Sequence, residues 1–310
     1  MKQRLLITGP MYPATLAQLE QAYEAQRLWS APDKDAVLAS LSDVTAVASS
    51  NSGGINGATM DKLPKLKVIA HFGVGYDTVD VDAARKRGIT ITNTPDVLTE
   101  EVADLALALL LATIRRVPQG DRYVREGKWL KGAMALTESL QGRTVGIVGM
   151  GRIGLAIARR CEAFGVKLAY QGPNAKPKVK WPYYPDPVAL ARDCDVIIVA
   201  CPGGEATRGL VSRRVIDALG PKGFLVNIAR GSVVDEPALL EALQQGRICG
   251  AGLDVFADEP HVPEAFFALE NVVLQPHVAS ATHPTRTAMG QLVIDNLAAH
   301  FGGKPLVTPI

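Results

Sequence analysis

The sequence has 310 residues, more than one compact core usually organises, and we therefore expect two lobes, each with its own core. Its 33 Lys and Arg residues against 31 Asp and Glu residues give no electrostatic reason to expect a nucleic acid or a membrane surface as partner, so small molecules are favoured. Four cysteines, without C-x-x-C spacing or a partnering His cluster, predict neither a disulfide framework nor a metal site and fit a cytoplasmic protein.

The first hundred residues alternate strand-like and helix-like segments. The apolar run before Gly9 is too short for the core of a signal peptide, so we interpret it as a first strand. Strands are expected at residues 5–8, 46–49, 67–72 and 89–92, and helices at 13–26 and 79–87. This alternation predicts a parallel sheet covered by helices.

An apolar helix is expected next. The segment 100–116 begins with two glutamates and ends with two arginines, as the helix dipole favours. Its apolar run, 105–114, is too short to span a bilayer. We therefore predict a buried helix that connects the two lobes.

A second and longer alternation begins at Thr144. Strands are expected at 144–149, 166–170, 195–200, 223–229, 250–256 and 271–277, with a helix ending near Phe164 after the first of them. Six strands with intervening helices predict a doubly wound parallel sheet. The last amphipathic segment, 285–300, is expected to pack back on the first lobe. Residues 1–98 and 285–310 would then form one α/β domain and residues 99–284 the other.

Three glycines, Gly149, Gly151 and Gly154, lie between the first strand of this second series and its helix. The spacing G-x-G-x-x-G in that context is typical of dinucleotide binding. The first glycine allows a tight turn, the second lets a pyrophosphate approach the backbone, and the third permits close packing of helix and strand. The phosphates would lie at the helix N-terminus, where amides are free. The alternative is a glycine turn that binds no ligand.

The end of the next strand bears on which dinucleotide is bound. Residues 171–175 contain no carboxylate, which an NAD site usually places there to bind the ribose hydroxyls and which would repel a 2′-phosphate. Its absence, with three lysines in residues 176–180 and Arg152 inside the glycine motif, favours NADP(H), while NAD(H) stays possible. Alternatively, Gln171 or Asn174 binds the diol of NAD and the lysines form a solvated face.

Single polar residues follow three of the later strands: Arg230, Glu259 and His277. Ligands bind beyond the carboxyl ends of strands in an open α/β sheet, so these side chains are expected to converge. An arginine can bind a carboxylate and polarise the adjacent carbonyl, a histidine can donate a proton near neutral pH, and a carboxylate can fix the imidazolium. Together they fit the reduction of a 2-oxoacid. Singly, they could be a helix cap, a surface acid and a core histidine.

The first domain offers one further candidate element. Gly73 and Gly75 flank Val74 directly after a strand, and small residues there would let successive amides form a nest for a carboxylate. A plain β-turn is the competing interpretation. The remaining histidines lack the context of a strand end and are interpreted as structural: His71, His261, His283 and His300.

These motifs together resemble the D-isomer-specific 2-hydroxyacid dehydrogenase family, and within it the glyoxylate/hydroxypyruvate reductases. The resemblance covers nearly the whole chain through segments 71–89, 93–116, 145–154, 227–243, 250–260 and 271–282. It implies two Rossmann-like doubly wound domains separated by a cleft. The discontinuous domain would bind substrate, residues 99–284 would bind the dinucleotide, and a homodimer would form largely through the nucleotide domains.

The resemblance also implies roles for single residues. Arg230, Glu259 and His277 would be catalytic, and the amides of Val74 and Gly75 would bind the substrate together with Arg230 and His277. The cofactor would contact Arg230 and His277 as well as Gly149, Gly151, Arg152, Ile153, Gly154, Gln171, Asn174, Cys201, Pro202, Ile228, Ala229, Asp254 and Ala279.

The sequence therefore predicts an enzyme that reduces glyoxylate and hydroxypyruvate to D-2-hydroxyacids with NADPH as hydride donor. One alternative is a D-2-hydroxyacid dehydrogenase for a larger 2-oxoacid such as a phenylpyruvate. Another is a nucleotide-sensing binding protein that has the same fold and turns over no 2-oxoacid.

Overall fold

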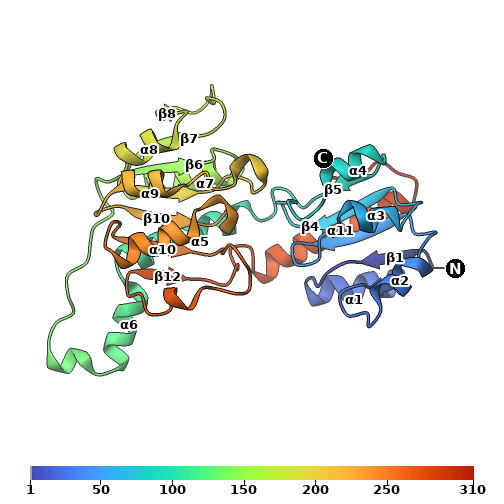
Figure 1. Ribbon diagram of the computed structural model, residues 1–310, viewed down its shortest axis with the longest axis horizontal. Coiled ribbons are helices and arrows are strands. Elements are labelled where there is room, and N and C mark those ends of the chain that lie inside the picture. The colour runs from blue at the N-terminus through green and yellow to red at the C-terminus, as the bar shows by residue number, and fades with distance from the viewer. Residues whose placement is uncertain (1) are drawn as a thin grey trace. The chain divides into compact units, whose positions relative to one another are not determined.

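Two compact units make up the computed structural model, which describes residues 2–310 (Figure 1). The first comprises the chain up to Leu98 together with Ser280–Ile310, and the second is Thr99–Ala279. Each unit is built on one parallel sheet. The predicted fold class, two doubly wound α/β domains, is thus confirmed.

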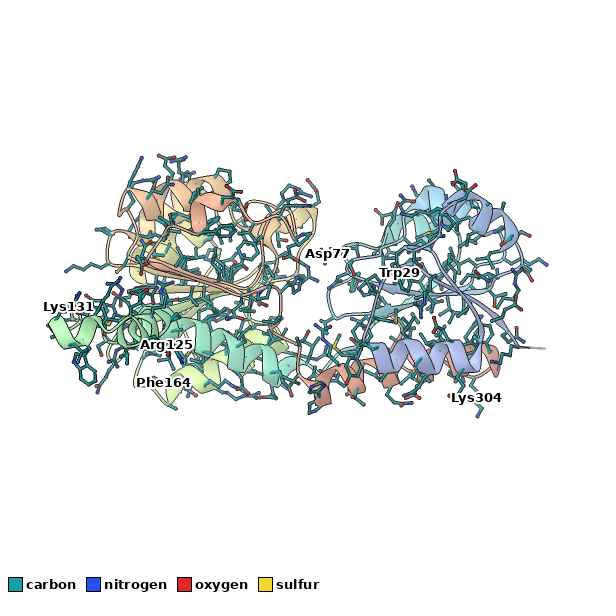
Figure 2. The ribbon with its side chains drawn as sticks, turned by 90° about the horizontal axis from the view of Figure 1, so that it is seen from below. Trp29, Asp77, Arg125, Lys131, Phe164 and Lys304 are labelled. Atoms are coloured by element: carbon teal, nitrogen blue, oxygen red, sulfur yellow. The ribbon has the colours of Figure 1, made fainter. Side chains whose placement is uncertain are left out.

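The first unit has five parallel strands in the order β2-β1-β3-β4-β5. Its strands are β1 (Arg4–Ile7), β2 (Glu24–Arg27), β3 (Ala46–Ser50), β4 (Val68–Phe72) and β5 (Thr90–Thr92), and its helices are α1 (Pro13–Ala22), α2 (Lys34–Ser40), α3 (Gly57–Asp61), α4 (Val81–Lys86) and α11 (His283–Phe301). Helices α1 and α11 pack together on one face, and α2, α3 and α4 close an apolar core on the other (Figure 2). Helices therefore cover both faces of the sheet.

Two segments of this unit differ from expectation. The prediction of a helix over 13–26 is wrong at its end, because Glu24–Arg27 forms the edge strand β2 and pairs in parallel with β1. The sequence of β2 has no apolar alternation, so its strand conformation comes from pairing with β1. The C-terminal helix begins earlier than residue 285, since Thr282 caps it, and the unit resumes at Ser280.

The second unit has seven parallel strands in the order β12-β11-β10-β9-β6-β7-β8. The strands are β6 (Thr144–Val148), β7 (Lys167–Gln171), β8 (Tyr183–Tyr184), β9 (Val196–Val199), β10 (Phe224–Asn227), β11 (Gly250–Leu253) and β12 (Val272–Leu274). The α-helices are α5 (Thr99–Ile114), α6 (Val117–Arg125), α7 (Arg152–Glu162), α8 (Pro187–Asp193), α9 (Arg213–Leu219) and α10 (Glu236–Gln244), with short 3-10 helices η1 (Lys128–Lys131), η2 (Glu205–Thr207), η3 (Gly231–Val233) and η4 (Glu264–Phe266). Strand β8 was not expected, because two residues are too few to give a pattern.

Helix α5, which we expected to connect the lobes, packs along the sheet of the second unit. It contacts α7 and the strands β10, β11 and β12, while α8, α9 and α10 lie with the core on the other face (Figure 2). Its N-terminus is tied to α7 by an ion pair between Glu100 and Arg160 at 2.7 Å. Across residues 2–310, no helix combines the length and the apolar character needed to cross a membrane.

Candidate active site

The glycine turn lies between β6 and α7, where the strand order of the second sheet reverses. Gly149 has a φ of 99°, and a Cβ there would lie 2.5 Å from the backbone nitrogen of Cys201. A Cβ on Gly154 would lie 2.1 Å from the carbonyl oxygen of Gly149, so both positions need glycine. A Cβ on Gly151 would meet nothing within 4 Å, which leaves this backbone open. The turn therefore fits a pyrophosphate at the N-terminus of α7.

The corresponding reversal in the first sheet lies between β1 and β3, and backbone atoms fill it. A Cβ on Gly9 would lie 2.5 Å from the Cα of Gly53. Thr8 Oγ1 also donates a hydrogen bond to the carbonyl oxygen of Gly53. Of the two reversals in residues 2–310, the one in the second unit has the open backbone that a dinucleotide needs.

The loop after β7 is where a ribose-binding carboxylate would be expected. Gln171 ends the strand, is buried, and donates from Nε2 to the carbonyl oxygen of Pro185 at 3.4 Å. Lys180 is paired with Glu162 at 2.8 Å. Asn174 and the lysines at 176 and 178 are exposed. The charge beside this loop is therefore positive. Of its three lysines, Lys180 forms the ion pair with Glu162, and Lys176 and Lys178 do not take part in that pair.

His277 and Glu259 form a hydrogen-bonded pair. His277 Nδ1 lies 2.6 Å from Glu259 Oε2, and the amide of Phe256 donates to Glu259 Oε1 at 3.0 Å. Burial alone would raise the pKa of Glu259, but the hydrogen bonds from His277 and Phe256 and the charges of His277 and Arg230 outweigh it and hold that pKa below its usual value. Glu259 is therefore ionised at neutral pH and fixes the imidazole ring of His277. The side chain of His277 remains 31% exposed.

Asp254, which directly follows β11, holds the loop that carries His277. Its carboxylate accepts from the amide of Val278 at 2.8 Å and from that of Ala279 at 3.0 Å. Its carbonyl oxygen accepts from the amide of His277 at 2.8 Å. Burial raises the pKa of Asp254, whereas the hydrogen bonds from Val278 and Ala279 oppose this rise. A fully buried carboxyl group thus sets the backbone on both sides of Val278.

Arg230 follows β10, and its backbone is fixed by its neighbours. Asn227 Nδ2 donates to the carbonyl oxygen of Arg230 at 3.0 Å. A Cβ on Gly231 would lie 1.9 Å from the carbonyl carbon of Phe256, so the loops after β10 and β11 are in backbone contact. Because β10, β11 and β12 are neighbours in the sheet, the three predicted catalytic residues gather at one edge.

In the first unit, Val74 and Gly75 lie in the turn after β4. Asn93 Nδ2 donates to the carbonyl oxygen of Val74 at 3.0 Å, and His71 Nε2 lies 3.0 Å from that of Gly75. Within the described chain, neither amide of this pair donates a hydrogen bond. Both amides remain available to a ligand.

Residues 107–279, more than half of the chain, match the family model of the D-isomer specific 2-hydroxyacid dehydrogenase, NAD binding domain. The chain belongs to the D-isomer specific 2-hydroxyacid dehydrogenase family. As a member of this family it is an NAD(P)-dependent oxidoreductase, and the resemblance drawn from the motifs is confirmed.

Relatives in this family match over essentially their whole length. The glyoxylate/hydroxypyruvate reductase A of Arabidopsis thaliana is 49% identical over 307 residues, which are 99% of this chain and 98% of that protein. The hydroxyphenylpyruvate reductase of Plectranthus scutellarioides is 47% identical over 307 residues, with the same coverage of 99% and 98%. The crystal structure of an NADPH-dependent glyoxylate/hydroxypyruvate reductase from Sinorhizobium meliloti, in complex with NADP and malonate, superposes with a TM-score of 0.94 at 49% identity and covers 100% of this chain and 97% of that one.

The other residues that the family resemblance assigns to the cofactor lie after neighbouring strands of the second unit. Cys201 and Pro202 follow β9, and Ile228 and Ala229 follow β10. Burial raises the pKa of the Cys201 thiol to about 11, so this side chain is an uncharged neighbour of the glycine turn. Arg152, Ile153 and Gly154 open α7. Gln171 ends β7, where its carbonyl oxygen accepts a hydrogen bond from the amide of Gly149 at 2.9 Å, and Asn174 lies in the loop that follows.

Sequence reasoning missed the supporting roles of three residues in this site. Asn227 supports the turn at Arg230, and Asp254, expected only to contact the cofactor, supports the loop of His277. His71, interpreted as structural, contacts the turn that contains Gly75. An asparagine or aspartate that directly ends or follows a buried strand was the available signal for the first two.

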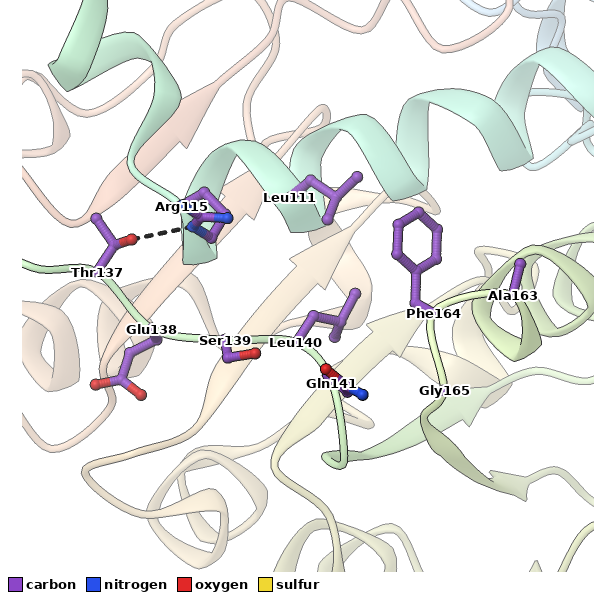
Figure 3. Close-up of a pocket in the computed structure, with 10 residues that line it drawn as sticks. All are labelled: Leu111, Arg115, Thr137, Glu138, Ser139, Leu140, Gln141, Ala163, Phe164 and Gly165. Atoms are coloured by element: carbon purple, nitrogen blue, oxygen red, sulfur yellow. Dashed lines mark hydrogen bonds between the residues drawn. The ribbon is translucent and has the colours of Figure 1, made fainter.

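The second unit also contains a hollow of about 760 Å³ that is unrelated to these residues (Figure 3). It lies where α5 and α7 end, and Arg115 Nε donates to Thr137 Oγ1 at 3.0 Å across one side of it. Its lining consists of Leu111, Arg115, Thr137, Glu138, Ser139, Leu140, Gln141, Ala163, Phe164 and Gly165. None of the predicted catalytic, substrate-binding or cofactor-binding residues lines this hollow, so we assign it no part in the reaction.

Proposed function

We propose that the enzyme reduces small 2-oxoacids, glyoxylate and hydroxypyruvate among them, to D-2-hydroxyacids with NADPH. The observation that carries the proposal is the 2.6 Å contact of His277 with the ionised Glu259, at the sheet edge that also holds Arg230. The substrates are inferred from the relatives, since the glyoxylate/hydroxypyruvate reductase A of Arabidopsis thaliana is 49% identical to this chain.

In this proposal each of the three side chains has one task. Arg230 binds the substrate carboxylate through its planar fork and draws electron density from the adjacent carbonyl oxygen. His277 donates the proton from Nε2 to that oxygen, forms the hydroxyl group, and recovers a proton from solvent. Glu259 holds the ring by Nδ1 and favours its charged form before the transfer. NADPH, when bound, supplies the hydride to the carbonyl carbon.

Two further groups complete the proposed site. The amides of Val74 and Gly75 would bind the substrate carboxylate, since neither has a partner within the described chain. The cofactor pyrophosphate would bind the backbone from Gly151 to Gly154, and the nicotinamide would lie beside Asp254 and Ala279 and the segment 228–230. Cys201, Pro202, Gln171 and Asn174 would lie along the adenosine half.

The preference for NADPH rests on charge. No carboxylate lies in residues 171–175, and the exposed lysines at 176 and 178 with Arg152 supply positive charge for a 2′-phosphate. The reductase from Sinorhizobium meliloti, described as NADPH-dependent and bound to NADP, supports this choice. NADH use at a lower rate is compatible with the same site, since Gln171 can donate to a diol.

The loss of absorbance at 340 nm tests the proposal directly. Glyoxylate, hydroxypyruvate, pyruvate and phenylpyruvate are each mixed with the enzyme and either NADPH or NADH. The proposal expects the fastest oxidation with NADPH and the two small substrates. A faster rate with phenylpyruvate would favour a larger substrate, for which the hydroxyphenylpyruvate reductase of Plectranthus scutellarioides at 47% identity is the specific precedent. No oxidation with any pair would favour a nucleotide sensor.

The proposal includes a homodimer formed through the arm, which we define as residues 117–136. The arm extends from the sheet of its own unit in Figure 1 and exposes Trp129, Leu130 and Leu136 by 69%, 94% and 98%. So many exposed apolar side chains are typical of an interface. Light scattering after size exclusion should give twice 33.0 kDa, and Leu136→Glu should give 33.0 kDa. Phe267→Glu, at a position 64% exposed outside the arm, is the control that should stay dimeric.

The proposal places the enzyme in the cytoplasm. All four cysteines are free thiols, and three of them are buried. Free thiols are typical of proteins in a reducing compartment, and the cytoplasm is such a compartment and also contains NADPH. Fractionation of cells that express the tagged protein would test this placement, and recovery in a secreted fraction would contradict it.

A further inference from the structure

Three successive carbonyl groups in the turn after β4 point into the framework of the first unit. The amide of Thr94 donates to the carbonyl oxygen of Gly73 at 3.0 Å. Asn93 Nδ2 donates to that of Val74 at 3.0 Å, and His71 Nε2 lies 3.0 Å from that of Gly75. All three donors belong to β4 or to the residues directly after β5.

The orientation of these carbonyls fixes the orientation of three amides. In a trans peptide the N–H points opposite to the C=O of the same plane, and none of these bonds is cis. The N–H groups of Val74, Gly75 and Tyr76 must therefore point away from the framework. Within residues 2–310, none of them donates a hydrogen bond. Three donors side by side form a cradle for a carboxylate.

His71 is held at both ring nitrogens and is fully buried. Nδ1 lies 2.9 Å from the hydroxyl of Ser49, its register partner on β3, and Nε2 lies 3.0 Å from Asn51 Oδ1 as well as from the turn. Because the Gly75 carbonyl oxygen can only accept, Nε2 carries the proton. A Cβ on Gly73 would lie 2.9 Å from Nε2, so glycine is what allows this approach.

Asn93 is held in turn by the C-terminal segment of the same unit. Thr308 Oγ1 donates to the carbonyl oxygen of Asn93 at 2.6 Å, and the amide of Asn93 donates back to Thr308 at 3.3 Å. The fully buried Asn296 on α11 donates to Thr308 Oγ1 at 3.0 Å. The side chain that fixes Val74 is therefore part of a network.

We propose that His71 and Asn93 are positioning residues that preset a cradle of three amides, with Tyr76 as its third donor, for the carboxylate of the substrate. This inference rests on the proposed function, which brings a 2-oxoacid carboxylate to Val74 and Gly75. His71 orients the peptide plane that bears the Tyr76 amide, and Asn93 orients the plane that bears the Gly75 amide. Neither side chain touches the substrate, so both act through the backbone.

The test compares variants that lose or keep the Nε2 donor. His71→Leu removes it, while His71→Gln places an amide N–H near the same point. His71→Leu should raise KM by about tenfold for glyoxylate, hydroxypyruvate and phenylpyruvate alike, because the carboxylate is common to all three. NADPH affinity should be unchanged, and His71→Gln should return KM to within about threefold of the wild type. His300→Leu is the matched control, because it makes the same change at a histidine of the same unit whose Nε2 lies 2.9 Å from Thr45 Oγ1.

A binding measurement separates this inference from the proposed function. Oxalate is titrated by calorimetry into the complex of each variant with NADP⁺, and His71→Leu should bind it about tenfold more weakly than wild type and His71→Gln. If oxalate binds more weakly to His71→Leu than to the other two proteins but no 2-oxoacid is turned over, the proposed function is overturned and the inference of a carboxylate-binding cradle stands. Turnover with an unchanged KM and unchanged oxalate affinity in His71→Leu would overturn the cradle alone.

Instability is controlled by a second variant. Asn93→Ala removes the donor to Val74 and should raise KM and weaken oxalate binding in the same uniform way. A role confined to folding would lower the melting temperature of both variants without moving KM or oxalate affinity, and would contradict the inference. Failure of wild type to bind oxalate would contradict it as well.

Discussion

The amide of His277 donates to the carbonyl oxygen of Asp254 at 2.8 Å, and His277 itself adopts a left-handed backbone with φ of 54°. Such a conformation costs roughly 1–2 kcal/mol for a residue with a Cβ. The two hydrogen bonds from Val278 and Ala279 to the Asp254 carboxylate stabilise it. The direction of the imidazole therefore depends on a buried carboxyl group next to it in space.

Asp254→Asn should weaken the hydrogen bonds between the Asp254 side chain and the amides of Val278 and Ala279, with little change in side-chain volume. One carboxylate oxygen becomes an NH₂ group that faces an amide donor, so a buried N–H loses its acceptor. We expect the free energy of unfolding to fall by about 1–3 kcal/mol. We expect kcat to fall by about tenfold to a hundredfold as His277 shifts. Chemical denaturation and steady-state kinetics measure the two effects.

Asp195→Asn is the matched control for that change. Asp195 Oδ2 also accepts from a backbone amide, that of Thr144 at 2.8 Å, but it precedes β9 at the opposite edge of the sheet. The Asp195→Asn variant should have a lower free energy of unfolding and an unchanged kcat. Equal losses of kcat in both variants would show that Asp254 acts only through stability.

His277→Ala removes the proposed proton donor. We expect kcat to fall by about 10²–10⁴, since this is the usual contribution of a positioned acid. NADPH affinity, measured by quenching of protein fluorescence, should change little. His261→Ala is the control, because His261 is 79% exposed and is paired only with Asp258 in the described chain. An unchanged kcat in His277→Ala would remove His277 from the mechanism.

The pH profile tests Glu259. Its pKa is held below the usual value, so its negative charge is present throughout the neutral range and favours the charged imidazole. Glu259→Gln removes this charge. The pH above which kcat/KM for reduction declines should then move to a lower value. An unmoved decline would mean that the charge of Glu259 does not act on the proton donor.

The same lowered pKa predicts a dependence of stability on pH. A depressed carboxyl pKa adds stability above the usual value of 4.5, and this stability is lost as pH falls through the lower value of the folded protein. The melting temperature of the wild type should therefore fall more steeply below pH 4.5 than that of Glu259→Gln. Parallel curves for the two proteins would contradict the assignment.

Cofactor preference is tested at the end of β7. Gln171→Asp places a carboxylate where it would repel a 2′-phosphate and bind ribose hydroxyls. We expect KM for NADPH to rise by about tenfold or more, and the ratio of kcat/KM values to move toward NADH. Lys180→Ala is the control, because that lysine already pairs with Glu162 at 2.8 Å. A shift of equal size in Lys180→Ala would assign the preference to general positive charge.

Much of the site was predictable because the topology of a parallel sheet converts order along the chain into position at one edge. The convergence of Arg230, Glu259 and His277 and the shape of the glycine turn follow from strand ends alone. The strand β2 was missed because its pairing with β1 depends on tertiary contacts and leaves no periodicity in four polar and small residues.

The role of His71 was missed for a different physical reason. Its neighbours Ser49 and Asn51 come from another strand, and only the register of β3 against β4 brings them to the ring. The single-sequence pattern shows a buried histidine beside two glycines and does not show which carbonyl each donor meets. Long-range hydrogen bonds of this kind leave no local signal.

The inward carbonyls of residues 73–75 have a consequence for how this enzyme can change over time. The donors that they turn outward belong to the main chain, so substitution of Val74 or Tyr76 alters a side chain and leaves an N–H in place. In the proposed cradle, the donors that bind the carboxylate would therefore be unaffected by mutation at those two positions, while the side chains there remain free to vary. Single substitutions there would then change which 2-oxoacid is preferred without removing the N–H groups that bind its carboxylate.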